Sequence, residues 1–430
     1  MKNHKFWLKI LRVFIVLLLS SSLCLAQSNN VRIKGKRRYW YLEVNGKRLY
    51  IKGVGCGLAK GKKGQDYLKL AKELGANTVR TWGTDQGTKQ YLDQAYKYGL
   101  YVCAGIWFNF VDDKGWPSYI GNSKYKKRKE REVLDYVNSF KDHPSILLWN
   151  VGNETIYWTK DPKQRIAIAR FLEELVQKIH KIDPNHPVLY SCACDYQELK
   201  IIKEHVPSLD IVGINSYGSI RFSQGKWDYL GFNIPYIITE FGPYGPWDRP
   251  KDINGVSIEQ TDREKALLYK YYLREIQEFK GYNLGAFAFH LGETTQESMT
   301  WWNINEGNSK RESFWVIHDI YTRKKTKRNL PRIKRFTLSK YRGIRPEEFI
   351  EVFVEPEGKN LKYSYKISTA FEGILRYYVN EWVETEIQGQ GNKVKIKAPK
   401  KEGLYRVYCF LRDRKGNITT FNRSIKVDGK

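Results

Sequence analysis

The sequence predicts an α/β fold: a (β/α)8 TIM barrel with an N-terminal hairpin at residues 31–325, followed at residues 330–430 by a small all-β domain of the immunoglobulin-like sandwich type. Eight apolar, strand-like runs alternate with helical patterns in the first segment, as in a parallel barrel. After the basic run Thr322–Arg328, helical spacing gives way to short alternating segments. At 430 residues the chain is long enough for both domains.

Residues 1–26 have the organisation of a secretory signal peptide. Four basic residues precede the apolar run Val13–Leu19, and Cys24–Ala26 supplies small residues before Gln27. This apolar run is too short to span a membrane. We therefore expect an exported protein (periplasmic, cell-surface or extracellular). Leu23 disfavours lipid attachment at Cys24, so we expect no lipid anchor.

The chain is strongly basic, with 74 Lys and Arg, 46 Asp and Glu and a formal net charge of +28. These cations are scattered through every segment, which argues against nucleic acid as a partner and favours a general basic bias or an acidic polysaccharide. Beyond the signal peptide the number of cysteines is odd, and most lie in apolar runs, so we expect buried free thiols: Cys56, Cys103, Cys192, Cys194 and Cys409.

The first elements form a hairpin and the first barrel strand. Tyr39–Val44 and Arg48–Val54 are strand-like and are joined by Asn45-Gly46, a strong hairpin signal. The second arm runs into the strand Ile51–Gly57, so we expect the hairpin to close the bottom of the barrel. The glycines of this strand lack the full dinucleotide-binding pattern, and no nucleotide site is predicted.

The other barrel elements follow in alternation, and short strands then fill the C-terminal segment. Strands are predicted at Asn77–Trp82, Leu100–Phe108, Ile146–Glu154, Pro187–Cys194, Asp210–Tyr217, Pro235–Gly242 and Leu284–Glu293. Helices are predicted at Gln65–Leu74, Lys89–Tyr98, Lys124–Phe140, Pro162–Ile182, Glu198–His205 and Thr261–Phe279. The all-β segment has predicted strands at Phe349–Val354, Leu361–Ile367, Leu375–Val379, Lys393–Ile396, Tyr405–Leu411 and Ile418–Val427.

Two glutamates lie at the ends of the fourth and seventh barrel strands, where barrel enzymes keep their chemistry. Two carboxylates about 5–5.5 Å apart across a sugar are what a retaining glycosidase needs. We therefore predict Glu154 as the acid/base and Glu240 as the nucleophile. The apolar setting of Glu154 beside Trp149 and Val151 is expected to raise its pKa, which would keep it protonated for the first step.

Neighbouring polar and aromatic residues complete the predicted site. Asn153 can donate to the sugar 2-hydroxyl, Arg80 can hold Glu240 ionised, and Tyr217 can donate to the same carboxylate. A buried salt bridge for Arg80 and a simple rim position for Tyr217 are the structural alternatives. Six tryptophans at or after strand ends predict an extended cleft for a glycan chain: Trp82, Trp107, Trp116, Trp158, Trp227 and Trp247.

Three segments resemble the retaining glycoside hydrolases of clan A, most closely the family 2 catalytic barrels. They are His143–Glu154 (HPSILLWNVGNE), Ile237–Gly242 (IITEFG) and Gly75–Asp85 (GANTVRTWGTD). The segment YIKGVGCG with GANTVR is also similar to β-1,3-glucanases and β-1,3-glucanosyltransferases of that clan. The resemblance covers about residues 40–320 and implies the roles given above for Glu154, Glu240 and Asn153, and less directly those of Arg80 and Tyr217.

The sequence departs from the family pattern at two points. Typical family 2 enzymes have a jelly roll and a sandwich ahead of the barrel, for which this chain has no room, so a typical β-galactosidase is not favoured. Many clan members end strand eight with a Trp under the sugar, where this chain has Phe289-His290. We expect His290, or else Trp301 or Trp302, to replace that platform. No metal-ligand spacing is visible, so neither a metal nor a cofactor is expected.

The leading hypothesis is a secreted retaining β-glycoside hydrolase acting on a poly- or oligosaccharide, with a β-1,3-glucan as the first substrate to try. A transglycosylase using the same residues and a non-catalytic glycan-binding barrel are the alternatives. The sequence leaves open the sugar, the linkage, the endo or exo mode and the oligomeric state.

Overall fold

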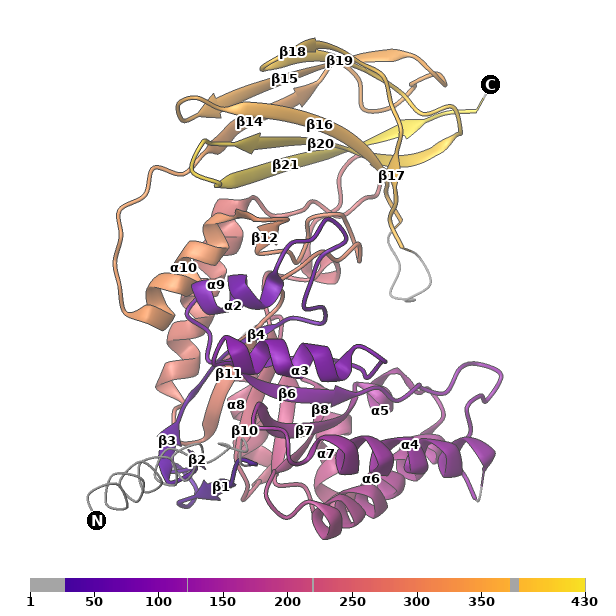
Figure 1. The fold of residues 1–430 in the computed structure, drawn as a ribbon. Helices are drawn as coiled ribbons and strands as arrows, with labels where there is room; N and C mark the ends of the chain where they lie inside the picture. The colour runs from indigo at the N-terminus through magenta and orange to yellow at the C-terminus, as the bar shows by residue number, and fades with distance from the viewer. Residues whose placement is uncertain (1–27, 122, 219, 372–378, 430) are drawn as a thin grey trace, which may run out of the picture.

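The computed structural model describes residues 28–121, 123–218, 220–371 and 379–429, and the predicted barrel is confirmed (Figure 1). Eight parallel strands close in the order β10-β11-β4-β5-β6-β7-β8-β9, which is chain order around the barrel. The strands are β4 (Ile51–Gly55), β5 (Thr78–Arg80), β6 (Tyr101–Ile106), β7 (Ile146–Asn153), β8 (Val188–Ala193), β9 (Ile211–Asn215), β10 (Tyr236–Phe241) and β11 (Asn283–Ala288). The predicted signal peptide lies outside the described residues.

All six predicted helices are present. They are α2 (Tyr67–Glu73), α3 (Thr88–Lys97), α4 (Lys124–Phe140), α6 (Pro162–Ile182), α7 (Tyr196–His205) and α9 (Asp262–Glu278). The structure adds α5 (Thr155–Trp158), α8 (Ile220–Leu230), α10 (Glu312–Thr322) and the 3-10 turn η1 (Pro246–Asp248), none of which was predicted. Gly225 inside α8 and the one-turn length of α5 weaken the sequence signal of these helices.

Burial explains why the barrel strands read as unbroken apolar runs. Strand β7 is buried at all eight positions, because its neighbouring strands, the helices outside and the barrel core inside cover both faces. The helices instead bury one face, and capping fixes their ends. At the start of α9, for example, Thr261 and Glu264 form a reciprocal capping box.

The hairpin closes the bottom of the barrel, as predicted. Strands β1 (Val31–Lys34), β2 (Tyr41–Val44) and β3 (Lys47–Leu49) form an antiparallel sheet. Val31, Leu42 and Val44 belong to one hydrophobic cluster with barrel residues that include Leu147 and Ile237. This arrangement leaves the carboxyl ends of the strands as the open rim.

Two four-stranded antiparallel sheets form the C-terminal β-domain, and they share one hydrophobic core. One sheet has the order β14-β15-β19-β18 and the other β17-β16-β20-β21. Most of the predicted strands are present, and part of the predicted strand Leu375–Val379 lies outside the described residues. The strands are β14 (Arg332–Leu338), β15 (Phe349–Glu357), β16 (Lys362–Thr369), β17 (Trp382–Val383), β18 (Ile387–Gln390), β19 (Lys393–Lys397), β20 (Gly403–Arg412) and β21 (Ile418–Val427).

The β-domain packs on the barrel through the segment that joins β11 to α10 (Figure 1). Met299 of this segment is buried in one cluster with Tyr408, Phe410 and Ile418 of the β-domain. The same segment contains the two-stranded β12 (Asn305–Glu306) and β13 (Ser309–Lys310). The β-domain thus packs against the loop between β11 and α10, which belongs to the rim of the barrel.

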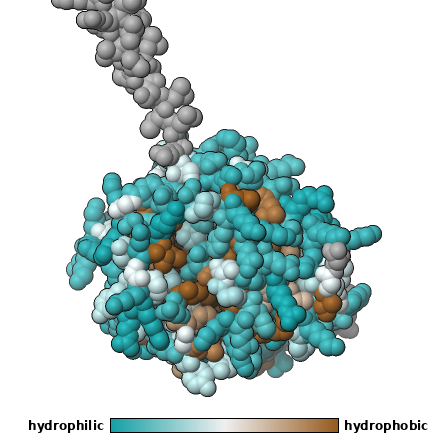
Figure 2. Space-filling view, turned by 90° about the horizontal axis from the view of Figure 1, so that it is seen from below, coloured by the Kyte–Doolittle hydropathy of each residue, from teal (hydrophilic) through white to brown (hydrophobic). Residues whose placement is uncertain are grey.

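The surface seen from below the view of Figure 1 is mostly hydrophilic, and its hydrophobic side chains gather in small separate patches (Figure 2). This distribution fits the many exposed lysines and arginines of the sequence. None of the helices in the described part of the chain is both long and apolar enough to cross a bilayer.

Candidate active site at the barrel rim

Five polar residues stand at or next to the carboxyl ends of barrel strands. Arg80, Asn153 and Asn215 are the last residues of β5, β7 and β9, Glu154 follows β7 directly, and Glu240 is the penultimate residue of β10. Because all eight strands are parallel, these ends meet at one rim. The fold therefore brings together residues that are up to 160 positions apart.

The carboxylate of Glu240 accepts hydrogen bonds from three side chains. Oε1 lies 2.7 Å from Nη1 of Arg80 and 2.7 Å from Nε1 of Trp82, and Oε2 lies 2.6 Å from the hydroxyl of Tyr217. Arg80 is fully buried and Glu240 is 6% exposed. Three donors, one of them charged, fix the orientation of this carboxylate. The predicted contacts of Arg80 and Tyr217 with Glu240 are both present.

Trp82 reaches Glu240 because a glycine lies beneath it. A Cβ at Gly55 would stand 2.6 Å from Cη2 of Trp82, so only glycine leaves room for the indole there. The guanidinium of Arg80 lies 5.0 Å from the centre of the same ring. Trp82 was predicted to line the substrate cleft, and its indole N–H is in fact directed at the carboxylate.

Glu154 sits in an unusual backbone position. Its φ is 52°, in the left-handed region, and its backbone N–H donates to the carbonyl of Ser191. The side chain accepts from Nδ2 of Asn215 at 2.7 Å and from Nε1 of Trp158 at 2.8 Å. Neutral donors therefore hold Glu154, in contrast to the charged donor on Glu240.

Asn153 links the two carboxylates. Its Oδ1 accepts from Nη2 of Arg80 at 2.7 Å and from Nδ2 of Asn215 at 3.1 Å. Arg80 and Asn215 in turn hold Glu240 and Glu154, so one network runs from one carboxylate to the other. Since both bonds use the amide oxygen, the amide NH2 of Asn153 is left to donate to another group.

Aromatic rings pack around Tyr217, and His290 lies nearby beside Trp82 and Phe289. Burial and the charge of Glu240 raise the pKa of Tyr217 well above its usual value, so its hydroxyl stays protonated and donates. Burial lowers the pKa of His290 to about 4, although the charge of Glu240 opposes this shift. His290 is therefore neutral at neutral pH, next to the ring of Trp82. The ring of Trp302 lies 4.7 Å from that of Tyr217.

The predicted aromatic residues take different positions. Trp301 was predicted to bind substrate, but it is 1% exposed, its N–H donates to Tyr244 and Arg406 of the β-domain lies against its ring. Trp302 takes the position beside Tyr217 instead. The prediction that Trp227 lines the mouth is wrong, because its ring stacks on Phe232 in the core.

The other tryptophans remain near the rim. Trp107 directly follows β6 and is half-buried, and Trp116 and Trp247 are 56% and 59% exposed. The ring of Trp247 packs edge-on against Tyr217 and near Trp302. Trp247 thus extends the aromatic surface outward from the nucleophile candidate.

The sequence interpretation missed two residues of this site, Asn215 and Glu198, and it predicted Trp158 as a cleft residue and not as a partner of Glu154. Asn215 and Trp158 hold Glu154, and the buried Glu198 lies behind the turn that follows it. Asn215 had a detectable signal, because it ends a strand two positions before Tyr217. Glu198 had no detectable signal, because a glutamate in the first turn of a helix usually interacts with the dipole of its own helix.

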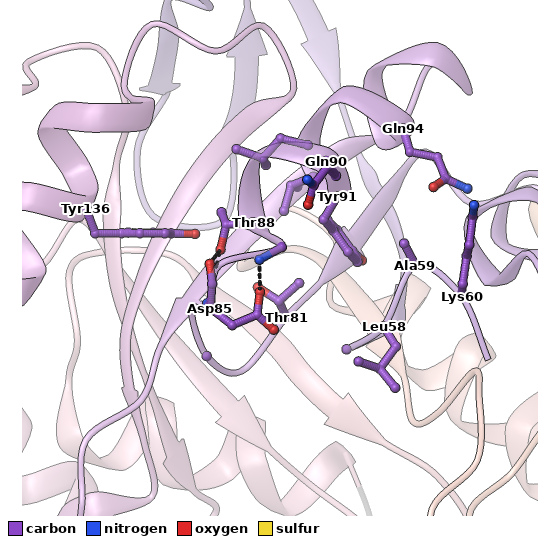
Figure 3. A pocket seen from close by; sticks show the side chains of 15 residues that line it. Leu58, Ala59, Lys60, Thr81, Asp85, Thr88, Gln90, Tyr91, Gln94 and Tyr136 are labelled. Atoms are coloured by element: carbon purple, nitrogen blue, oxygen red, sulfur yellow. Dashed lines mark hydrogen bonds between the residues drawn. The ribbon is translucent and has the colours of Figure 1, made fainter. Parts of the chain in front are cut away.

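A cavity of about 410 Å³ lies beside the rim, between the loop after β4 and helix α3 (Figure 3). Tyr136 reaches from α4 toward the turn in which the hydroxyl of Thr88 donates to the carbonyl of Asp85 at 2.8 Å. Neither Glu154 nor Glu240 lines this cavity. It is a separate feature from the carboxylate network.

The cysteines of the described residues form no disulfide. All five described cysteines are free thiols, as predicted, and four are buried. Within residues 28–121, 123–218, 220–371 and 379–429, no three His, Cys, Asp or Glu side chains gather as a metal-binding group.

The closed barrel and its rim network form a TIM barrel with two carboxylates at its rim. Residues 31–243 match the model of "Glycosyl hydrolases family 2, TIM barrel domain", which confirms the predicted resemblance to the family 2 barrels of clan A. The matched segment contains both Glu154 and Glu240.

Individual relatives agree with this assignment. A putative β-glucuronidase of Formosa agariphila is 29% identical over 155 residues, covering 33% of this chain and 18% of that protein. A β-galactosidase of Thermoanaerobacterium thermosulfurigenes is 28% identical over 211 residues, covering 46% and 26%. The crystal structure of Bacteroides uniformis β-glucuronidase has a TM-score of 0.53 at 14% identity, covering 93% of this chain and 48% of that one, and it supports the fold. The chain spans less than half the length of these relatives.

Proposed function

We propose that this protein is a retaining β-glycoside hydrolase that cleaves a poly- or oligosaccharide by double displacement. The single observation that carries the proposal is the network Glu240–Arg80–Asn153–Asn215–Glu154, which holds two carboxylates at one barrel rim. The match to the family 2 barrel model supports the same chemistry.

Glu240 is the proposed nucleophile. Arg80, Trp82 and Tyr217 hold its carboxylate so that one oxygen can attack the anomeric carbon and form a glycosyl ester. The attack cleaves the bond between that carbon and the leaving oxygen, which takes the proton of Glu154. A bound sugar is then oriented by Asn153, whose NH2 can donate to the 2-hydroxyl.

Glu154 is the proposed acid and then base. After the leaving group departs, its carboxylate removes a proton from water, and the resulting hydroxide oxygen displaces Glu240 from the anomeric carbon. Two inversions give net retention. Asn215 and Trp158, both neutral donors, hold the carboxyl through both steps.

The test is hydrolysis of activated aryl β-glycosides. The panel includes glucosides, glucuronides and galactosides, the last two because of the relatives' names. The purified protein should cleave at least one, and Glu240→Gln should lower kcat/KM by more than about 10⁴-fold, as expected for loss of a nucleophile. Full activity in Glu240→Gln would contradict the assignment, and binding without any cleavage would favour the glycan-binding alternative.

Among natural substrates we propose a β-1,3-glucan first, with transglycosylation as the alternative fate of the same intermediate. Incubation with laminarin-type oligosaccharides and sizing of the products separates the two. Shorter products alone indicate that water attacks the intermediate, and products longer than the substrate indicate that a sugar does.

An anionic polysaccharide is a second candidate substrate, and a surface feature of α4 favours it. Four exposed cations lie on one face of this helix, at spacing i, i+3, i+4 and i+7: Lys124, Lys127, Arg128 and Arg131. The helix begins on the rim side of the barrel, because it follows β6. The exposed Trp116 packs against Tyr125 of its first turn, so an aromatic ring adjoins these cations.

Charge reversal tests this second candidate. The triple variant Lys124→Glu, Lys127→Glu, Arg131→Glu should weaken binding to polygalacturonate and flatten its salt dependence, with binding to a neutral β-glucan unchanged. The matched control reverses three exposed lysines of the β-domain: Lys334, Lys359 and Lys362. Equal effects of the two triple variants would reject a role for α4.

We also propose an immunoglobulin-like topology for the β-domain and export of the protein. Lettered along the chain, the two sheet orders correspond to A-B-E-D and C′-C-F-G, the order of such domains. The domain boundaries proposed from sequence, 325 and 330, fall between the end of α10 at Thr322 and the start of β14 at Arg332. Fractionation of producing cells tests export, because residues 1–26 should be absent from a mature exported chain.

A further inference from the structure

Glu198 is a fully buried carboxyl group that the proposed mechanism does not use. It belongs to the first turn of α7 and is 1% exposed. Its Oε1 accepts from the hydroxyl of Tyr190 at 2.8 Å and from the backbone N–H of Tyr157 at 3.2 Å, and its Oε2 accepts from the backbone N–H of Ala193 at 2.7 Å. Such a buried carboxyl needs partners of this kind, and it has three.

Two of these contacts converge on α5, the one-turn helix that begins directly after Glu154. The N–H of Tyr157 donates to Glu198, and the N–H of Ile156 donates to the hydroxyl of Tyr190, 3.0 Å away. These amides belong to the first turn of a helix, where backbone donors have no partner within the helix. Glu198 of α7 and Tyr190 of β8 therefore cap α5 from outside the helix.

Glu154 is itself the N-cap residue of α5, and its side chain makes no capping hydrogen bond. An N-cap side chain normally folds back onto the amides of the second and third helical residues. Those are the amides of Ile156 and Tyr157, which Tyr190 and Glu198 occupy. The carboxyl group of Glu154 is thereby left to accept from Asn215 and Trp158 at the rim.

We propose that Glu198 is a positioning residue for the acid/base: it caps α5 in place of Glu154, so that the carboxyl of Glu154 points to the substrate and not to its own helix. Burial, and after it the charge of Glu154, raise the pKa of Glu198 well above its usual value, although the hydroxyl of Tyr190 opposes this shift. The influence of Glu154 on Glu198 agrees with two carboxyl groups on either side of one turn.

This inference rests on the proposed function, and leaving-group dependence tests it. Protonation by Glu154 matters for a poor leaving group such as phenol, and little for a good one such as 2,4-dinitrophenol. We expect Glu198→Ala to lower kcat/KM for the phenyl β-glycoside by at least about tenfold, within the range of general acid catalysis. The loss for the dinitrophenyl glycoside should be several times smaller.

Two variants make the result specific. Glu198→Gln keeps one oxygen that can accept from Tyr157 and should restore part of the lost activity on the phenyl glycoside. Glu275→Ala is the matched control, since Glu275 is also 1% exposed but pairs with Arg221 on α8. It should lower stability without changing the ratio of the two substrates.

The outcomes separate the two proposals. If the unaltered protein cleaves no aryl glycoside, the proposed function fails. If it does cleave one, and Glu198→Ala slows both substrates equally or leaves both unchanged, the positioning role of Glu198 is overturned. A selective loss on the phenyl glycoside with partial rescue by glutamine supports it.

Discussion

The buried carboxylates at the barrel rim differ in their partners from those at the contact between barrel and β-domain. At the domain contact, Glu259 lies 2.5 Å from Nζ of Lys265, and Asp262 lies 3.0 Å from Nη1 of Arg311. At the rim, Arg80 pairs with Glu240, but neutral side chains and backbone amides hold Glu154 and Glu198. Carboxylates that are each paired with a cation suit a structural contact. Buried carboxyl groups held by neutral donors suit acid/base chemistry.

The domain contact is a hydrogen-bonded network as well as an ionic one. Glu259 also accepts from Asn422 at 2.7 Å, and Asp262 accepts from the backbone N–H of Thr420 at 2.7 Å. Ser298 donates to Glu259 at 2.6 Å and precedes Trp301 and Trp302 in the same rim loop. The β-domain thus helps to hold the loop that carries Trp302.

The largest contrast is expected between two buried arginines. Arg80→Met removes a charged donor from Glu240 and should lower kcat/KM by about 10²–10³-fold, as loss of a preorganised donor does. Arg311→Met leaves Asp262 buried without its cation and should lower the free energy of unfolding by about 3–5 kcal/mol. Aryl-glycoside kinetics and urea unfolding of both variants measure the two effects.

This comparison fails if Arg311→Met also loses activity, or if Arg80→Met loses only stability. A folded Arg311→Met should keep kcat/KM within about threefold of the unaltered protein, well below the loss expected for Arg80→Met. Loss of activity in Arg311→Met at full stability would mean that the domain contact takes part in the chemistry.

Acid should weaken the domain contact through Glu259. Burial alone would raise the pKa of this carboxyl, but Lys265 and Arg406 overcome it and lower the pKa to about 2, from 4.5. A depressed carboxyl pKa contributes stability that is complete above the unfolded value and is lost as pH falls through the folded value. Stability should therefore fall between about pH 5 and pH 2.

Glu259→Gln provides the comparison. It should be less stable at pH 7 and should show a shallower dependence on pH in that window, as measured by thermal unfolding across the pH series. An equal slope in both proteins would show that Glu259 does not carry the effect.

A smaller effect is expected at Tyr217. Tyr217→Phe removes one hydrogen bond from the Glu240 carboxylate and keeps the ring against Trp302. Hydrogen bonds to charged groups contribute about 1.5–3 kcal/mol, so kcat should fall by roughly 10- to 150-fold with little change in stability. Unchanged kcat would show that Arg80 and Trp82 suffice to hold the nucleophile.

The sequence predicted the barrel well because each of its strands and most of its helices carry a strong local signal. Strand β7 is apolar along its length, and Asn45-Gly46 forms the predicted hairpin with φ values of 49° and 79°. The helix α8 was missed because a glycine interrupts its pattern, and β18 because all four of its residues are exposed. The sequence pattern thus predicts helices and strands whose apolar residues recur at regular spacing, and it misses those without such a pattern.

The site was predictable only in part, for a related reason. Strand ends identify Glu154, Glu240 and Arg80, since parallel strands share one rim. Nothing local indicates that the indole of Trp82 donates to Glu240, or that Trp301 faces the β-domain and Trp302 the rim. Those orientations depend on the packing of distant segments.

Covalent capture of the nucleophile tests the central claim most directly. A 2-deoxy-2-fluoro-β-glycosyl fluoride of the sugar that the protein accepts should stall the glycosyl ester, and peptide mass mapping locates it. We predict one label, on Glu240. A label on Glu154 or another carboxylate, or none while the matching substrate is turned over, would contradict the account.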